Sequence, residues 1–170
     1  EESGPMKVGV AIVDVLTGLF TAIGILAALQ ERERSGKGQV VDVALLDVSV
    51  AALVNVASNY LVSGRLPRLL GNAHPNIVPY QTFEAQDQPM VVAVGNDRQF
   101  ASFAQVIGRP ELAEDERYVT NPQRLAHRDE LIAIIQEELK KRPAHQWMEQ
   151  LQAVGVPCAP IQTLDQVFSH

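Results

Sequence analysis

The chain has 170 residues, 46% of them apolar and 20% charged, which is typical of a globular protein with one ordinary domain or two small ones. Glycine and proline are spread along the sequence, so a fibrous repeat and a disordered tract are excluded. Fourteen lysines and arginines against twenty aspartates and glutamates give a net charge of −6. Because a nucleic-acid backbone needs a basic surface, we exclude nucleic acid as a partner.

Cysteine and histidine usage indicates an intracellular protein without a metal site. Cys158 is the one cysteine in the sequence, so it cannot form an internal disulfide, which favours a reducing compartment. We therefore predict a cytoplasmic location. The four histidines, at 74, 127, 145 and 170, lack the close spacing of zinc ligands, and no phosphate-binding lysine loop is present.

An apolar segment in the first part of the chain predicts a helix over residues 15–34. Between residues 8 and 29 the one charged residue is Asp14, and the 15 uncharged residues after it are fewer than the roughly 20 that a membrane span needs. We therefore predict a buried core helix and no membrane partner. Gly18 and Gly24 predict that another segment approaches this helix closely.

A tight turn at Gly36 precedes a short β-branched run, residues 40–46, that predicts a strand buried inside a sheet. Asp47 is predicted to open a second helix, over residues 48–62, that closes at Gly64. A single buried strand has no partner strands within the first 66 residues. This orphan strand predicts that the chain is a segment of a longer polypeptide.

The sequence changes character after residue 65. Proline, glycine and asparagine interrupt any regular element from 65 to 79, and a loop of that length is usually functional or a linker. Residues 80–85 and 90–94 predict a β-hairpin. Helices are predicted to follow after Asp97 and at 111–115, 122–141, 143–154 and 164–168, with an extended segment at 156–161 and Thr163 as the cap of the last helix.

These elements predict two parts and a connection. Residues 1–66 are predicted to form a helix-strand-helix fragment of a large domain, and residues 80–170 a small α+β domain. Residues 67–79 are predicted to be a Gly/Pro-rich linker. The predicted fold class is therefore α/β followed by α+β.

Asp14 is the strongest candidate for chemistry. It lies between two apolar runs, where an ionised carboxylate is costly unless it is hydrogen-bonded or functional. The simpler interpretation is a helix N-cap, with the carboxylate accepting from first-turn N–H groups. The two roles are compatible, because a helix N-terminus keeps a carboxylate ionised and available as a nucleophile.

The loop that contains Gly71, Asn72, Ala73 and His74 is the second candidate. A glycine lets backbone N–H groups approach a substrate oxygen, and His74 could donate to that oxygen or move a proton. A solvated connector is the simpler interpretation.

Two other residues are weaker candidates. Arg98 could bind a carboxylate, although a surface pair with Asp97 is the simpler interpretation. Cys158 lies between prolines in an apolar run, where a buried and inert thiol is expected.

Six ordered stretches resemble the family III CoA-transferases of the CaiB/BaiF type. They are residues 10–18, 23–29, 35–47, 71–76, 92–100 and 155–160. The resemblance extends over nearly the whole chain, and six matches in order are more specific than any single motif.

The resemblance implies a Rossmann-like large domain, a smaller α+β domain and an interlocked homodimer. It implies that Asp14 is the catalytic residue, which attacks an acyl-CoA thioester to give a mixed anhydride and then an aspartyl-CoA thioester that a small carboxylic acid resolves. Coenzyme A is then part of the substrate and no cofactor is expected. Gly71, Asn72, Ala73 and His74 fall on the family's substrate-binding loop, which would shield the anhydride from water.

The chain departs from the family in two respects. Some relatives carry consecutive glycines where this chain has Asn72, Ala73 and His74. The family is also more than twice as long, and its N-terminal portion supplies most contacts to coenzyme A. We therefore expect the 170 residues to be a fragment that is inactive alone.

Two alternatives remain at this point. A 2-methylacyl-CoA racemase would use Asp14 for proton transfer next to the thioester, but racemase-like chains tend to carry Ile-Glu-Pro-Gln-Phe at residues 96–100, where this chain has Asn-Asp-Arg-Gln-Phe. A non-catalytic α+β interaction module would use Asp14 as a cap and residues 71–79 as a linker.

Overall fold

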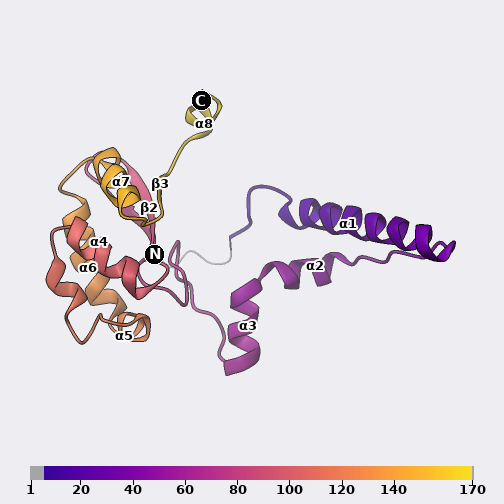
Figure 1. The fold of residues 1–170 in the computed structure, drawn as a ribbon, viewed down its shortest axis with the longest axis horizontal. Helices are drawn as coiled ribbons and strands as arrows, with labels where there is room; N and C mark the ends of the chain where they lie inside the picture. Colours follow the sequence, from indigo (N-terminus) through magenta and orange to yellow (C-terminus); the bar gives the residue numbers. More distant parts are fainter. Residues whose placement is uncertain (1–5, 170) are drawn as a thin grey trace. The chain divides into compact units, whose positions relative to one another are not determined.

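The computed structural model describes residues 6–169, so the outer limits of the predicted parts, residues 1 and 170, lie outside the described residues. The chain divides into two compact units. The N-terminal unit ends at Arg68, and the C-terminal unit begins at Leu69. Figure 1 shows that the N-terminal unit is helical and that the C-terminal unit combines helices with a small sheet.

The first helix of the N-terminal unit, α1, spans Ile12–Ser35 and confirms the prediction for that segment. It ends at Gly36, whose left-handed backbone (φ 71°) lets its N–H donate to the Arg32 carbonyl oxygen. The close approach predicted at Gly24 is present, because a Cβ atom there would lie 2.7 Å from Val41 Cγ1. The same prediction is wrong for Gly18, where an added Cβ atom would have no other segment of residues 6–169 within 4 Å.

The strand predicted for residues 40–46 is wrong. Residues 37–44 form neither helix nor strand, and helix α2, Leu45–Ala52, begins inside the predicted strand. A strand needs neighbours to pair with its backbone, and the described part of the N-terminal unit contains no strand. Val40, expected inside a sheet, is 92% exposed.

The second predicted helix is divided in two. After α2, the chain bends by 83° and continues as α3, Val54–Ser63, up to Gly64 in the left-handed region. The bend coincides with a positive φ of 43° at Val54, which is uncommon for a β-branched residue.

Helix α1 is not buried within the described chain, which contradicts the prediction of a core helix. Its large apolar side chains are exposed, among them Leu19, Phe20, Ile23 and Leu26. By length and composition alone α1 is apolar enough to cross a membrane, and a core helix of a soluble protein passes the same test. Residues 6–169 therefore leave a large apolar surface of this helix uncovered.

The C-terminal unit contains a three-stranded antiparallel sheet in the order β1-β2-β3. Strands β1 (Tyr80–Glu84) and β2 (Pro89–Ala93) form the predicted hairpin, with Phe83 opposite Met90. The predicted extended segment supplies β3 (Cys158–Pro160) beside β2. The chain between residues 64 and 79 contains no helix or strand, as the Gly/Pro pattern predicted.

Helices pack beside this sheet, as Figure 1 shows. They are α4 (Asp97–Val106), the 3₁₀ turn η1 (Pro110–Ala113), α5 (Asn121–Ala126), α6 (Arg128–Leu139) and α7 (Ala144–Ala153). The last helix, α8 (Leu164–Phe168), follows an extended segment after β3 and is exposed. The single helix predicted for 122–141 is therefore two helices that meet at His127. Thr163 caps α8 as predicted, and its N–H donates to Gln166 Oε1 at 2.9 Å.

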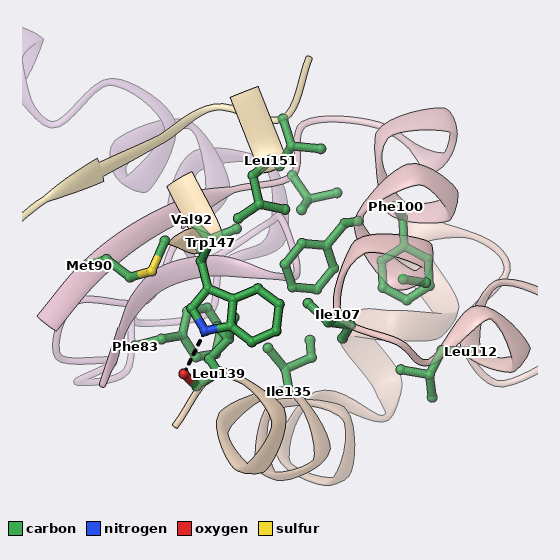
Figure 2. Packing of buried hydrophobic residues seen from close by; sticks show 14 of the residues in the cluster. Phe83, Met90, Val92, Phe100, Ile107, Leu112, Ile135, Leu139, Trp147 and Leu151 are labelled. Carbon is green, nitrogen blue, oxygen red and sulfur yellow. Dashed lines mark hydrogen bonds between the residues drawn. The ribbon is translucent and has the colours of Figure 1, made fainter. Parts of the chain in front are cut away.

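The core of the C-terminal unit lies between the sheet and these helices. Figure 2 shows Trp147 of α7 packed among side chains of the sheet, α4 and α6. Its indole N–H donates to the Leu139 carbonyl oxygen at 2.8 Å, so the polar atom of this large ring is satisfied. Residues that the sequence places far apart thus form one hydrophobic cluster, which includes Val78 near the end of the loop at 71–79.

A conservative core substitution measures this packing. Ile135 is fully buried, so Ile135→Val is expected to lower the free energy of unfolding by about 1 kcal/mol. Urea unfolding followed by the fluorescence of Trp147, the one tryptophan of the chain, measures the change. Ile161, which is 44% exposed, is the matched control. An equal loss in Ile161→Val would contradict the assigned core.

Candidate functional site

Asp14 occupies the first turn of α1, as its third helical residue, and its side chain is exposed. The N-cap position belongs to Ala11, so the interpretation of Asp14 as the cap is wrong. The helix starts three residues earlier than a cap at Asp14 requires, because Val15 N–H already donates to the Ala11 carbonyl oxygen. The carboxylate therefore benefits from the positive end of the helix without being committed to a cap.

The residues next to Asp14 do not restrain it. Thr17, which could have completed a capping pattern, turns its hydroxyl back to the Val13 carbonyl oxygen at 2.7 Å. The carboxylate forms no ion pair with any other residue in the described range 6–169. Asp14 therefore combines three properties of a carboxylate nucleophile, namely exposure, a favourable helix terminus and freedom from a salt bridge.

The predicted substrate loop begins with a turn at Gly71, whose φ of 56° lies in the left-handed region. Gly71 and Asn72 are exposed, while Ala73 and His74 are partly buried. Ala73 N–H donates to the Leu70 carbonyl oxygen at 3.0 Å, which closes the turn. Asp14 belongs to the N-terminal unit and this loop to the C-terminal unit, so each is described within its own unit.

His74 has a well-defined environment. Its backbone N–H donates to the Tyr80 carbonyl oxygen at 2.8 Å, and the two rings stack at 5.1 Å with an angle of 15°. Its Nδ1 accepts from the Asn76 backbone N–H at 3.1 Å. These contacts set the orientation of the imidazole ring. The sequence alone could not predict that orientation.

Helices α5 and α6 hold the second half of the loop. Arg128 Nη2 donates to the His74 carbonyl oxygen at 2.8 Å and to that of Pro75 at 3.3 Å. Asn121 donates from Nδ2 to the Asn76 carbonyl oxygen at 2.8 Å and accepts the Val78 N–H at 3.1 Å. Every backbone partner here lies more than 40 residues away in sequence, so the loop is fixed by tertiary contacts.

Arg124 completes this support and was not identified by the sequence analysis. Its guanidinium is 0% exposed and lies 4.4 Å from the centre of the Phe100 ring. It donates to the carbonyl oxygens of Val78 (2.7 Å), Tyr118 (2.8 Å) and Val119 (3.3 Å) and to the carboxylate of Asp97 (2.8 Å). Burial lowers the pKa of this guanidinium, and the Asp97 carboxylate opposes that shift. The one feature of the sequence that could have pointed to Arg124 was its spacing of four residues from Arg128, which would place both arginines on one face of the helix predicted for 122–141.

The surface pair expected between Arg98 and Asp97 is not present. Asp97 accepts from Arg124 and from the Asn121 backbone N–H at 3.0 Å, so its carboxylate faces α5. The physical reason is that a buried guanidinium needs a counter-charge more than an exposed one does.

Cys158 is partly buried on β3, with Sγ 3.7 Å from the Met148 carbonyl oxygen. Burial raises the pKa of the thiol, which reduces the reactive thiolate fraction. We predict that Cys158 reacts with a thiol reagent at pH 8 at least about tenfold more slowly in the folded chain than in urea. Equal rates would contradict the inert role. Among residues 6–169, no three His, Cys, Asp or Glu side chains are placed to hold a metal ion.

The chain was compared with known families and proteins. A family model described as CoA-transferase family III matches residues 1–170. The succinate–glutarate CoA-transferase of Agrobacterium fabrum is 44% identical over 165 residues, which are 97% of this chain and 41% of that protein. The acetyl-CoA:oxalate CoA-transferase of Acetobacter aceti is 40% identical over 158 residues, 92% of this chain and 41% of that protein. The chain thus spans about two fifths of the length of these relatives.

Solved structures agree with the fold. A CaiB/BaiF family protein from Brucella suis matches with a TM-score of 0.72 at 44% identity, over 99% of this chain and 45% of that one. A hypothetical protein from Mycobacterium tuberculosis matches with a TM-score of 0.84 at 30% identity, over 99% of this chain and 44% of that one. The matched parts of these solved structures therefore share the combination of helices and a small antiparallel sheet seen in this chain.

Proposed function

Because the chain belongs to CoA-transferase family III, we propose that the whole protein moves coenzyme A from an acyl-CoA thioester to a carboxylic acid, with Asp14 as the nucleophile. The observation that carries this proposal is the state of Asp14, exposed in the first turn of α1 and not used as a cap. A carboxylate is ionised at neutral pH, and proximity to a bound thioester compensates for its low nucleophilicity.

The proposed reaction has four steps that balance. A carboxylate oxygen of Asp14 attacks the thioester carbonyl, the C–S bond breaks and the CoA thiolate leaves a mixed anhydride. The thiolate attacks the aspartyl carbonyl and releases the donor acid, which leaves an aspartyl-CoA thioester. The acceptor carboxylate displaces the thiolate to form a second anhydride. The thiolate then attacks the acceptor acyl carbon and regenerates the carboxylate of Asp14.

The loop of Gly71, Asn72, Ala73 and His74 is proposed to bind substrate in this cycle. Both anhydrides are hydrolysed readily, so water has to be excluded while they exist. The exposed turn at Gly71 and Asn72 offers backbone N–H groups, and the partly buried ring of His74 offers a further donor, for a carboxylate or carbonyl oxygen. The names of two relatives contain succinate, glutarate and oxalate, and we propose a small dicarboxylic acid as one substrate.

The remaining parts of the proposal concern the complete protein. We propose that it is a cytoplasmic homodimer without a bound cofactor and that a Rossmann-like large domain covers the exposed apolar side chains of α1. Residues 1–170 alone are expected to show no turnover, because this surface is uncovered in the described chain.

Trapping tests the covalent step. The complete protein, mixed with succinyl-CoA and then with hydroxylamine, is expected to carry an aspartyl hydroxamate at Asp14, detected by mass spectrometry of its peptides. Omitting succinyl-CoA is the control. If no adduct forms and the α-hydrogen of a 2-methylacyl-CoA exchanges with deuterated solvent, the protein is a racemase and the transferase proposal is wrong.

A further inference from the structure

We propose that Arg128 is a positioning residue that fixes His74 as a hydrogen-bond donor, so that the Nε2–H of this imidazole meets a substrate oxygen. The inference rests on the proposed function only for the identity of the substrate. Its structural part depends on contacts within the C-terminal unit alone.

The proton position follows from the contacts of the ring. His74 Nδ1 accepts the Asn76 N–H at 3.1 Å, so in the neutral imidazole Nδ1 carries the lone pair and Nε2 carries the proton. Stacking on Tyr80 keeps the ring plane fixed. In this tautomer Nε2 donates a hydrogen bond and cannot accept a proton, so His74 acts as an oxygen anchor rather than as a general base.

The backbone that carries this ring is held from one side. Arg128 donates through one terminal nitrogen, Nη2, to the carbonyl oxygens of both His74 and Pro75. Because the donor is charged, these bonds are stronger than bonds between neutral groups. The two accepting carbonyl groups belong to the stretch of backbone that joins the His74 ring to the Asn76 N–H, which sets the tautomer. Losing the two hydrogen bonds therefore frees the backbone on which the tautomer depends.

The other terminal nitrogen of Arg128 argues against a purely stabilising role. Nη1 is buried and has no hydrogen-bond partner in the part of the chain that the structure describes. A buried donor without a partner costs free energy, so Arg128 is not the residue that stability alone would select at this position. A lysine, which lacks a second terminal nitrogen, would avoid that cost and keep one charged donor.

The two halves of the loop differ in restraint. From His74 to Val78, the carbonyl oxygens and N–H groups bond to Arg128, Asn121 and Arg124. Before His74, the one backbone hydrogen bond of the exposed turn among the residues that the structure describes is that of Ala73 to Leu70. The geometry therefore assigns a fixed anchor to His74 and leaves any adjustment to substrate to the turn at Gly71.

The first test compares Arg128→Met, Arg128→Lys and Arg117→Met in the complete protein labelled with ¹⁵N-histidine. Arg117 is a matched control, because it is an exposed arginine paired with Asp115 and Glu130. The His74 nitrogen signals, assigned by their loss in His74→Gln, are expected to report one tautomer in the unmodified protein and in Arg117→Met. Arg128→Met is expected to shift them towards an average of two tautomers, and Arg128→Lys to restore them in part.

Kinetics supply the second readout. Arg128→Met is expected to raise KM for the acceptor acid about tenfold, the value of one well-placed hydrogen bond, with a smaller change in kcat. His74→Gln keeps an N–H donor at the end of its side chain, so it is expected to stay within about threefold of the unmodified protein, whereas His74→Ala loses about tenfold.

The outcomes separate this inference from the proposed function. Unchanged nitrogen signals in Arg128→Met, or equal changes in Arg117→Met, overturn the positioning role. If Arg128→Met fails to fold, the signals and KM of Arg128→Lys decide by the same criterion: a partial shift towards two tautomers supports the positioning role, and unmodified values overturn it. A His74→Gln variant as impaired as His74→Ala overturns the donor role. A protein without any CoA transfer refutes the proposed function, while the nitrogen signals still decide the position of His74.

Discussion

Asp14→Asn is expected to abolish CoA transfer in the complete protein, with kcat lowered by about a thousandfold or more. The amide cannot form the anhydride, because its nitrogen lone pair is delocalised and its oxygen carries no full charge. The fold should tolerate the change, since Asp14 is exposed and caps nothing. The loss of a favourable charge in a first helical turn costs about 0.5 kcal/mol. Steady-state assays and thermal unfolding measure the two effects.

Asp47 offers a matched control for this prediction. Like Asp14 it is the third residue of a helix with an alanine at the N-cap and an exposed carboxylate. Asp47→Asn therefore removes the same charge from the same helical position without touching the proposed nucleophile. We expect an equal change in melting temperature and unchanged turnover. If Asp14→Asn kept the same full turnover as Asp47→Asn, neither carboxylate would form a covalent intermediate.

Local signals predicted the hairpin and the helix ends. In β1 and β2 the buried residues Phe83, Met90 and Val92 alternate with less buried ones, which is the period of a strand packed on one face. Gly36 and Gly64 both adopt the left-handed conformation that ends a helix. These features depend on neighbouring residues, so the sequence carried enough information to place them.

Other elements depend on partners that a local pattern does not contain. A short apolar run such as 40–46 suits a buried strand or the start of a buried helix, and only a neighbouring strand could have selected the former. The break at Val54 has no glycine or proline to announce it. Asp14 is three residues inside the helix rather than at its cap, a difference within the error with which a sequence pattern places a helix end.

The candidate site shows the same division. The composition of residues 71–79 marked a candidate substrate loop, and Asp14 was distinguished as a candidate by its apolar neighbours. The residues that hold the loop were not found, because Arg128 lies 54 positions from His74 and Asn121 lies 43 positions from Val78. Two arginines four residues apart indicate a common helix face, but nothing in their spacing identifies a backbone carbonyl as the partner.

Arg124→Met is expected to lower the stability of the C-terminal unit by about 3 kcal/mol. The variant keeps an apolar side chain of similar length and removes all the donors of a fully buried guanidinium. The carbonyl oxygens of Val78 and Tyr118 would then be buried without their bonds, and Asp97 would lose its counter-charge. Urea unfolding followed by Trp147 fluorescence reports on this unit, because the chain has no other tryptophan.

Arg117→Met tests whether burial is the cause. Arg117 also bonds to carboxylates, those of Asp115 (2.6 Å) and Glu130, but it is exposed, and exposed ion pairs contribute at most about 1 kcal/mol. A large loss of unfolding free energy in Arg124→Met with a small one in Arg117→Met would show that buried carbonyl oxygens left without hydrogen bonds dominate the cost. Similar losses in both variants would mean that the guanidinium of Arg124 stabilises this unit only as a surface charge does, and the support assigned to the loop at Val78 would be wrong.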